Sequence, residues 1–463
     1  MKGGISIKTK VSVLDFGAVP NANSLQTLAF QNAIDHCFKQ GGGEVTVPAG
    51  EYILGDIRLR SGITLHLLEN AVLKGSKNPK DYRNILNDTL EPLPENEATD
   101  AHWHSPFEWK KLGGGFKDYL YTIGSYWSHG LIRAAFAENI AIIGEEGSLI
   151  DGNNVYDPEG EENYRGPHTV NMHFCKNVRF SGYTVNDSSN WAHAIFQSEN
   201  ITFQNLTVLA GHDAIHTRAC SDVKIKNCKL ITGDDCIAGF DNINVTVQNC
   251  EISSACSAFR YGGYNILIED CNIYGPCKYP FRGSLAAEDK ISGEQTAASI
   301  KARNNMLSLF TNFVTNDLPV RHTAGKIMIR NCNVQNADRF LHLNLSGNEP
   351  WQVGNPPKDI TFQNIKAENI SLGIYCYGVG DVPVTLNLEN IDYSVREGFE
   401  EDALFKVAHF DEINLRNVNV TNFAGDTLIK TWSEGGRVNT ENLSCPIKDL
   451  ITKQTDPFKC SAI

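Results

Sequence analysis

Short runs of alternating apolar and polar residues recur through the middle of the chain at a nearly constant spacing. Each run begins with Asn or Asp and continues with β-branched, aliphatic or aromatic residues. The first residues of five such runs are 23, 22, 22 and 21 positions apart: Asn177, Asn200, Asp222, Asn244 and Asn265. Alternation over a few residues is typical of a half-buried β-strand. The chain is therefore predicted to repeat a unit that carries short strands.

A second series of residues keeps the same spacing. Cys228, Cys250 and Cys271 are 22 and 21 positions apart, and similar short sequence motifs recur at 326–332 and 359–364. A period near 22 fits the coil of a parallel β-helix, in which equivalent residues of successive coils lie roughly 4.8 Å apart. A leucine-rich repeat would need a Leu consensus and a helical turn in each unit, and neither is evident. We predict an all-β fold, a right-handed parallel β-helix.

The pattern changes near the N-terminus and in two later segments. Residues 24–40 have apolar residues at helical spacing and are followed by three glycines, which predicts a helix that caps the first coil. Residues 87–126 and 283–322 interrupt the coil period, and 300–310 has a helix-like pattern. Insertions in solenoids map to loops on one face, often the binding face. We predict one domain over 1–463, with 1–60 as cap and first coils and these insertions as long cleft-lining loops.

Composition narrows the range of partners. The chain of 463 residues is 41% hydrophobic and 21% charged, as in soluble folded proteins. Its net charge of −13 opposes binding to nucleic acid and to anionic membrane surfaces. The 13 cysteines are predicted to be mostly small buried residues, which favours a reducing compartment. We expect a cytoplasmic monomer, or a secreted or periplasmic one if a signal segment has been removed.

Three aspartates carry the candidate chemistry. Asp213 precedes Asp234 and Asp235 by 21 and 22 residues, one coil, so the three are predicted to form a patch on one face. Hydrolysis of a glycosidic bond with inversion needs one carboxyl group that protonates the leaving oxygen and another that activates water. Like charges this close raise one pKa and keep that acid protonated. A Gly-Asp-Asp turn at a coil corner is the structural alternative.

Several motifs resemble, in order, those of a known family. They are Asp15-Phe-Gly-Ala18, Val47-Pro-Ala-Gly-Glu-Tyr52, Leu149-Ile-Asp-Gly152, Arg165-Gly-Pro-His168, Asn186-Asp-Ser-Ser-Asn-Trp191 and Thr232-Gly-Asp-Asp-Cys236. Together they resemble glycoside hydrolase family 28, the polygalacturonase-like pectin hydrolases, and the last motif matches the family's double-aspartate signature. The resemblance implies that Asp235 is the general acid and that Asp234 and Asp213 activate water. It implies no metal or other cofactor.

The sequence departs from the family pattern at positions that surround the aspartates. Cys256 stands where the family has the histidine of Gly-His-Gly, and Arg282-Gly-Ser284 keeps the arginine of Arg-Ile-Lys but lacks the lysine. That Arg–Lys pair grips the uronate carboxylate in the family. Arg260, one coil after the aspartate pair, is a candidate replacement because a guanidinium binds a carboxylate bidentately. A purely structural ion pair is the alternative for Arg260 and for Arg282.

Further candidate binding residues flank these positions. His212 and His216 lie on either side of Asp213, where each is a candidate to tune the acid or a stacked corner residue. Tyr261, next to Arg260, is a candidate wall of a sugar subsite. The aromatic-rich segment 102–127 is a candidate stacking platform, with a small satellite core as the alternative.

Together these features predict an inverting glycoside hydrolase for a pectic or related glycan that contains uronic acid. The two long insertions suggest exo action. A calcium-assisted polysaccharide lyase and a glycan-binding relative without activity are the alternatives. The expected partner is an oligo- or polysaccharide. No metal-ligand cluster is evident, and the glycine clusters lack the Lys-Ser/Thr of a phosphate-binding loop.

Overall fold

The structure, a computed structural model, describes residues 9–82, 129–293, 303–315, 321–347, 349 and 351–455. The predicted all-β, right-handed parallel β-helix is confirmed, since the strands pair in parallel and few helices are present. The chain divides into two compact units, Met1–Ile215 with Ala286–Glu294, and His216–Leu285 with Gln295–Ile463. The boundary falls within β16 (Ile215–Arg218). Among the described residues, no helix is long and apolar enough to span a bilayer.

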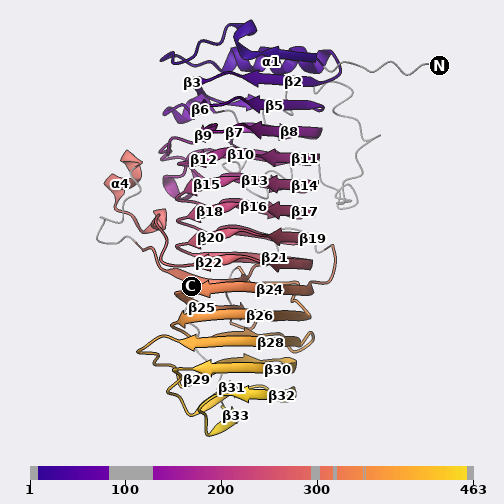
Figure 1. The fold of residues 1–463 in the computed structure, drawn as a ribbon, viewed down its shortest axis with the longest axis vertical. Coiled ribbons are helices and arrows are strands. Elements are labelled where there is room, and N and C mark those ends of the chain that lie inside the picture. Colours follow the sequence, from indigo (N-terminus) through magenta and orange to yellow (C-terminus); the bar gives the residue numbers. More distant parts are fainter. Residues whose placement is uncertain are drawn as a thin grey trace, which may run out of the picture. The chain divides into compact units, whose positions relative to one another are not determined.

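The first unit consists mainly of short strands (Figure 1). Its elements are β1 (Thr9–Ser12), η1 (Val13–Phe16), α1 (Thr27–Lys39), β2 (Gly43–Val47), β3 (Gly50–Leu54), β4 (Ile57–Arg58), β5 (Ile63–Leu67), β6 (Ala71–Gly75), η2 (Pro79–Asp81), β7 (Gly130–Ala135), β8 (Glu138–Gly144), β9 (Leu149–Asp151), η5 (Glu161–Asn163), β10 (His168–His173), β11 (Lys176–Ser181), β12 (Thr184–Asn186), β13 (His193–Phe196), β14 (Glu199–Gln204), β15 (Thr207–Ala210) and α4 (Ala287–Ser292).

Three rows of parallel strands build the coils of this unit. They are β2–β5–β8–β11–β14, β3–β6–β9–β12–β15 and β4–β7–β10–β13. The predicted N-terminal helix is α1, which lies over the first coil (Figure 1). It buries Phe30, Ala33, Ile34 and Cys37 against that coil, so that the apolar interior of the first coil is covered at its open end.

The second unit has longer strands that continue through coil corners. Its elements are β17 (Ser221–Lys226), β18 (Lys229–Thr232), β19 (Ile237–Gln248), β20 (Glu251–Ser254), β21 (Ser257–Glu269), β22 (Asn272–Tyr274), η6 (Arg282–Ser284), β23 (Met306–Asn312), β24 (Gly325–Gln335), β25 (Ala337–Asn344), β26 (Asp359–Ile370), β27 (Ile374–Tyr377), β28 (Val384–Val395), β29 (Ala403–Ala408), β30 (Phe410–Thr421), β31 (Thr427–Thr431), β32 (Arg437–Ser444) and β33 (Asp449–Lys453).

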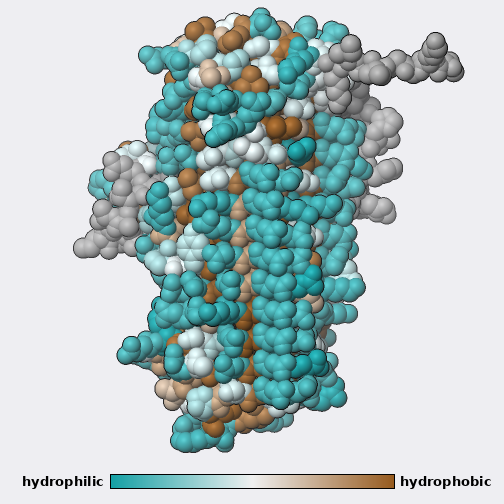
Figure 2. Space-filling model, in the orientation of Figure 1, coloured by the Kyte–Doolittle hydropathy of each residue, from teal (hydrophilic) through white to brown (hydrophobic). Residues whose placement is uncertain are grey.

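Consecutive coils of the second unit stack in parallel, with local register shifts between Gly239 and Asn242, Ala367 and Ile370, and Val384 and Thr385. The long strands pair in the order β17–β19–β21–β24–β26–β28–β30–β32, and β21–β23–β25–β27–β29–β31–β33 forms another row. Inward positions such as Ile360 and Phe362 are fully buried. The outward positions are mostly polar, and Figure 2 shows them as a continuous hydrophilic column across these coils. The alternation seen in the sequence therefore separates core from solvent.

Asparagines at the coil corners bond to one another. Asn364, Asn390, Asn417 and Asn442 have left-handed backbone, with φ between 51° and 55°. Each Nδ2 donates to the Oδ1 of the asparagine one coil earlier, at 2.9, 2.8, 2.8 and 2.9 Å, and the partner of Asn364 is Asn331. Asn tolerates this conformation better than most residues, and its amide can donate and accept at once. The repeated Asn therefore serves both the turn and the stacking of coils.

The cysteines also occupy the predicted environment. Of the 12 described cysteines, 11 are buried, and all 12 are free thiols. Cys228, Cys250, Cys271 and Cys332 repeat one local contact, in which each Sγ lies 3.1–3.3 Å from the carbonyl oxygen two residues earlier. They fill small inward sites beside the corners, as free Cys commonly does.

Two predictions about the insertions have different outcomes. The helix predicted at 300–310 is wrong, because Met306–Asn312 forms β23 and pairs in parallel with β21 and β25. The apolar residues of this segment suit a buried strand as well as a helix, and the free edge of β21 selects the strand. The insertion at 87–126 and the whole aromatic segment 102–127 lie outside the described residues.

The asparagine ladder gives a stability prediction. Asn390→Ala should lower the free energy of unfolding by about 1–2 kcal/mol, because Ala resists left-handed backbone and both ladder hydrogen bonds are lost. Asn390→Gly loses the same bonds but fits the backbone, so its stability should lie between those of the wild type and the Ala variant. Urea denaturation of the three proteins measures the difference. Equal midpoints for Ala and Gly would show that the left-handed backbone contributes nothing.

Candidate functional site

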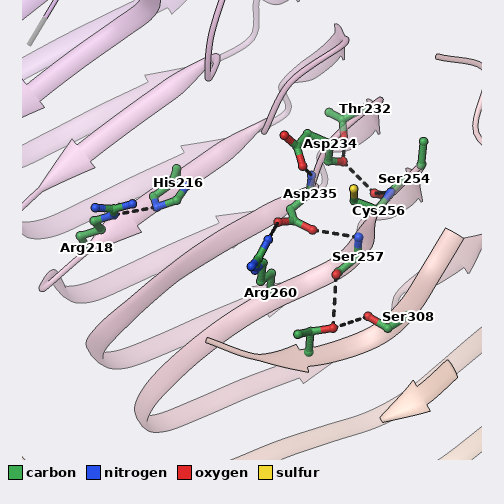
Figure 3. Close-up of polar contacts among 12 residues, drawn as sticks. His216, Arg218, Thr232, Asp234, Asp235, Ser254, Cys256, Ser257, Arg260 and Ser308 are labelled. Carbon is green, nitrogen blue, oxygen red and sulfur yellow. Dashed lines mark hydrogen bonds and ion pairs between the residues drawn. The ribbon is translucent and has the colours of Figure 1, made fainter. Parts of the chain in front are cut away.

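The aspartate pair lies in a tight turn of the second unit, between β18 and β19. In the next coil the equivalent turn joins β20 and β21 and contains Cys256. The register places Thr232 beside Ser254 and Ala238 beside Arg260. Side chains from two adjacent coils are thereby brought around Asp234 and Asp235 (Figure 3).

Two hydroxyl groups hold the backbone of the aspartate turn. The Oγ1 of Thr232 donates to the carbonyl oxygen of Asp234 at 2.8 Å, and the Oγ of Ser254 donates to the same oxygen at 2.7 Å. The Oγ of Ser254 also accepts from the backbone N–H of Cys256 at 2.8 Å. The bond from Ser254 to Asp234 joins the two coils, while the other two bonds are local to their own turns, so the aspartate turn is tied to its neighbour as well as to itself.

Asp235 is almost wholly buried, with 3% of its surface exposed. Its Oδ1 accepts the backbone N–H of Ser257 at 2.8 Å, and its Oδ2 lies 3.6 Å from Nη1 of Arg260. Its own N–H donates to Oδ1 of Asp234 at 3.1 Å, and Asp234 is 8% exposed. Figure 3 shows Ser257 and Arg260 reaching Asp235 from β21.

These surroundings raise the pKa of Asp235 to about 6. Burial is the largest cause, since removal from water disfavours the charged carboxylate. The positive charge of Arg260 opposes this rise, the negative charge of Asp234 adds to it, and the hydrogen bonds from Ser257 oppose it. Asp235 therefore retains its proton at mildly acidic pH, as a proton donor requires.

Cys256 lies beside both aspartates. Ligand atoms of Asp234, Asp235 and Cys256 lie within 4.8 Å of one another, the one such group of three among the described residues. Burial, with the charges of both aspartates, raises the pKa of the Cys256 thiol well above its ordinary value, so the thiol is neutral. Nη2 of Arg303 lies 3.1 Å from the sulfur, and its charge opposes the binding of a metal cation there.

Arg260 connects the aspartate pair to aromatic side chains. Its guanidinium carbon lies 5.0 Å from the ring centre of Phe313 and 5.3 Å from that of Trp351, within the range of cation–π contacts. The Arg260 side chain is 26% exposed. The guanidinium therefore faces a buried carboxyl group on one side and remains partly accessible to solvent.

His212 and Asp213 belong to the first unit and follow β15. Both are buried. The ring of His212 lies 5.9 Å from that of Tyr164, and the carbonyl oxygen of Asp213 accepts the backbone N–H of Ala192 at 2.8 Å. Lys290, from α4, places its Nζ 4.7 Å from the centre of the same Tyr164 ring. The predicted cooperation of Asp213 with the pair in the second unit stays a prediction.

The remaining predicted residues have other surroundings. His216 lies apart from the aspartate pair in Figure 3, and its Nε2 accepts a hydrogen bond from Nε of Arg218 at 3.0 Å. Tyr261 as a subsite wall is wrong, because its side chain is buried and its hydroxyl lies 2.6 Å from the Oγ1 of Thr217. Strand alternation turns it away from the face that carries Arg260. Arg282 is fully buried at the start of η6, and its binding role stays a prediction.

Several residues that surround Asp234 and Asp235 were not predicted from the sequence. Ser254 and Ser257 follow Thr232 and Asp235 by one coil, so the period of 22 would have found them. Arg303 lies within the segment 300–310, for which the sequence predicts a helix. Phe313 and Trp351 come from a later strand end and loop, and no local pattern indicates their approach to Arg260.

Parts of the chain are similar in sequence to known proteins. The profile described as "Glycosyl hydrolases family 28" matches residues 121–272, which contain all three aspartates. A Vitis vinifera protein named "Probable polygalacturonase" is 27% identical over 250 residues, 50% of this chain and 45% of that protein. An exo-poly-alpha-D-galacturonosidase of Dickeya chrysanthemi is 40% identical over 72 residues, 16% of this chain and 12% of its own. The chain spans less than half the length of the curated relatives that it matches.

A solved structure shares the fold over most of the chain. The family 28 exopolygalacturonase of Yersinia enterocolitica aligns with a TM-score of 0.60 and 17% identity, covering 93% of this chain and 78% of its own. At that identity the likeness concerns the fold alone. The family profile covers the motif that forms the aspartate turn, and the parallel β-helix carries that turn. The profile matches about a third of the chain, and over residues 121–272 the chain is similar to glycoside hydrolase family 28.

Proposed function

We propose that this protein is an inverting glycoside hydrolase of a pectic or related glycan that contains uronic acid, and that it acts from a chain end. The observation that carries the proposal is the carboxyl group of Asp235, which is buried beside the carboxyl group of Asp234 and has a pKa of about 6. Inverting hydrolysis needs one such acid and one base. The names of the relatives, polygalacturonase and exo-poly-alpha-D-galacturonosidase, support the choice of substrate and of exo action.

In the proposed reaction Asp235 donates its proton to the glycosidic oxygen as the bond from that oxygen to the anomeric carbon breaks. Asp234, with Asp213 assigned from the sequence, takes a proton from water, whose oxygen bonds to the anomeric carbon from the opposite face. The products are a sugar with inverted anomeric configuration and a sugar hydroxyl. Asp235 is left as a carboxylate, which the N–H of Ser257 and the charge of Arg260 stabilise.

Arg260 is the proposed partner of the substrate carboxylate. A pectic substrate is anionic and the protein carries a net charge of −13, so binding needs a local cation. Arg260 is partly exposed and lies 3.6 Å from Asp235, so a uronate bound there would be close to the proton donor. A bound uronate would also offset the positive charge that lowers the pKa of Asp235 and would help to keep the acid protonated.

Replacing the proton donor tests the reaction class. Asp235→Asn should lower kcat on polygalacturonan and oligogalacturonides by about 10²–10⁴-fold, the usual contribution of general acid catalysis. Product release is measured by mass-resolved chromatography, and the anomer formed by the wild type is measured by NMR. Asp222→Asn is the matched control, because Asp222 is an exposed corner residue of the same unit. It should retain wild-type activity.

Each contrary outcome excludes a different part of the proposed function. An unsaturated product that absorbs in the ultraviolet and disappears with chelator would make the protein a lyase. Retained anomeric configuration would exclude inversion. Products of mixed length from the first turnovers would exclude exo action, and release of nothing from these substrates or from rhamnogalacturonan fragments would exclude a pectin hydrolase.

The pH dependence of the reaction tests the role of Arg260. Because the acid must be protonated, kcat/KM should fall as the pH rises through about 6. Arg260 lowers the pKa of Asp235, so Arg260→Gln should move this decline to higher pH and also raise KM. Arg416→Gln is the control, since Arg416 is exposed and pairs with Glu389 and Glu441. A decline at the wild-type pH in Arg260→Gln would show that Arg260 does not act on the acid.

A further inference from the structure

Trp351 is the one aromatic residue among the described residues that leaves about half of its surface in solvent, 51%. It lies in the loop between β25 and β26 of the second unit. Burial of apolar surface contributes roughly 25 cal/mol per Å², so an exposed indole forgoes stabilisation that a buried one would give. A single exposed apolar residue has little meaning by itself, and the contacts of Trp351 decide its role.

The indole lies next to the guanidinium that reaches the proton donor. The ring centre of Trp351 is 5.3 Å from the guanidinium carbon of Arg260, whose Nη1 is 3.6 Å from Oδ2 of Asp235. Phe313 contacts the same guanidinium at 5.0 Å and is buried. Of the two aromatic rings that contact Arg260, one therefore supports it from the protein and the other is open to solvent.

Backbone hydrogen bonds hold the loop at Trp351 and at Val353. The N–H of Val314 donates to the carbonyl oxygen of Trp351 at 2.9 Å, and the N–H of Val353 donates to the carbonyl oxygen of Val314 at 3.0 Å. Val314 directly follows Phe313 in the chain. The same short segment therefore fixes the backbone beside Trp351 and places the Phe313 ring on Arg260.

A buried carboxylate holds the loop from within. Glu349 is 9% exposed, and its carboxylate oxygens lie 2.9 Å from Nε2 of His342, 2.7 Å from Nδ2 of Asn344 and 3.2 Å from Nε2 of Gln352. Burial alone would raise the pKa of Glu349, but the hydrogen bond and charge of His342, with the two amides, hold it below its usual value. The loop is thus anchored at residues 349 and 352, on either side of Trp351.

We propose that Trp351 is the stacking platform of a sugar subsite in which Arg260 holds the carboxylate of the same sugar, and that Glu349 is the positioning residue of this platform. The proposal rests on the proposed function and names the ligand class, a pyranose ring that carries a carboxylate. The C–H face of a pyranose is apolar and packs on an indole, while its carboxylate pairs with a guanidinium in the same subsite. An anchored loop presents the ring without further ordering of the chain on binding.

Substitution at Trp351 is the first test. Trp351→Ala should raise KM for oligogalacturonides about tenfold with a smaller change in kcat, because stacking on an aromatic ring contributes roughly that factor. In the Asp235→Asn background, calorimetry with trigalacturonate should show the same loss of affinity. Trp351→Phe should recover part of it. Val353→Ala removes an apolar side chain of similar exposure, 40%, from the same loop and should leave KM unchanged.

Glu349→Gln tests the positioning role with a variant that keeps the size of the side chain. It should raise KM and leave the pH at which kcat declines unchanged, because Glu349 acts on the loop and not on Asp235. A change in that pH with unchanged KM would overturn the positioning role. Circular dichroism of each variant shows whether the fold is retained.

The outcomes separate this proposal from the reaction itself. If wild type releases product and Trp351→Ala has wild-type KM and affinity, the platform is overturned and the hydrolase stands. If wild type releases nothing but Trp351→Ala loses affinity for trigalacturonate in the Asp235→Asn background, the hydrolase fails and the platform stands. If trigalacturonate does not bind at all, both are overturned.

Discussion

The contacts around Asp235 depend on the in-register stacking of consecutive coils. A parallel ladder repeats each backbone position about 4.8 Å away, so a residue in one turn meets the backbone of the equivalent turn in the next coil. Ser254 therefore reaches the carbonyl oxygen of Asp234, and the N–H of Ser257 reaches the carboxylate of Asp235. A slip of one residue between β19 and β21 would turn Arg260 to the opposite face of the strand. The Asn ladders at the corners and the inward apolar residues oppose such a slip along each unit.

The same stacking buries two carboxyl groups next to each other, and this burial raises the pKa of Asp235. Two carboxyl groups are buried in adjacent positions of one turn, where water cannot screen them. Hydroxyl and N–H groups form hydrogen bonds to the backbone and the carboxyl groups of this turn. The cationic side chains reach the site from the next coils. Arg303 contacts the thiol of Cys256, and Arg260 remains 3.6 Å from Asp235. Burial is left as the dominant effect on Asp235, and it favours the protonated acid.

Sequence could predict the features that recur with the coil and failed where contacts come from outside it. The period predicted the parallel β-helix and placed Arg260 one coil after the aspartates, and the usual burial of free Cys predicted the environment of the cysteines. Tyr261 is adjacent to Arg260 in the chain, but strand alternation turns it to the opposite face. The 306–312 strand was mistaken for helix because a short apolar run fits both, and only the edge of β21 decides. Trp351 follows Arg260 by 91 residues in a loop outside the repeat, so no periodic signal marks it.

The position of Arg260 is compatible with the two roles proposed for it, one toward the acid and one toward an anionic ligand. A bidentate ion pair at hydrogen-bond distance would stabilise the carboxylate of Asp235 and carry its pKa below the ordinary value, leaving no proton to donate at mildly acidic pH. At 3.6 Å the attraction is weaker, and the rings of Phe313 and Trp351 contact the guanidinium without competing for its N–H donors. The aromatic rings thus hold the cation through its faces, and its separation from Asp235 leaves burial as the dominant effect on the acid.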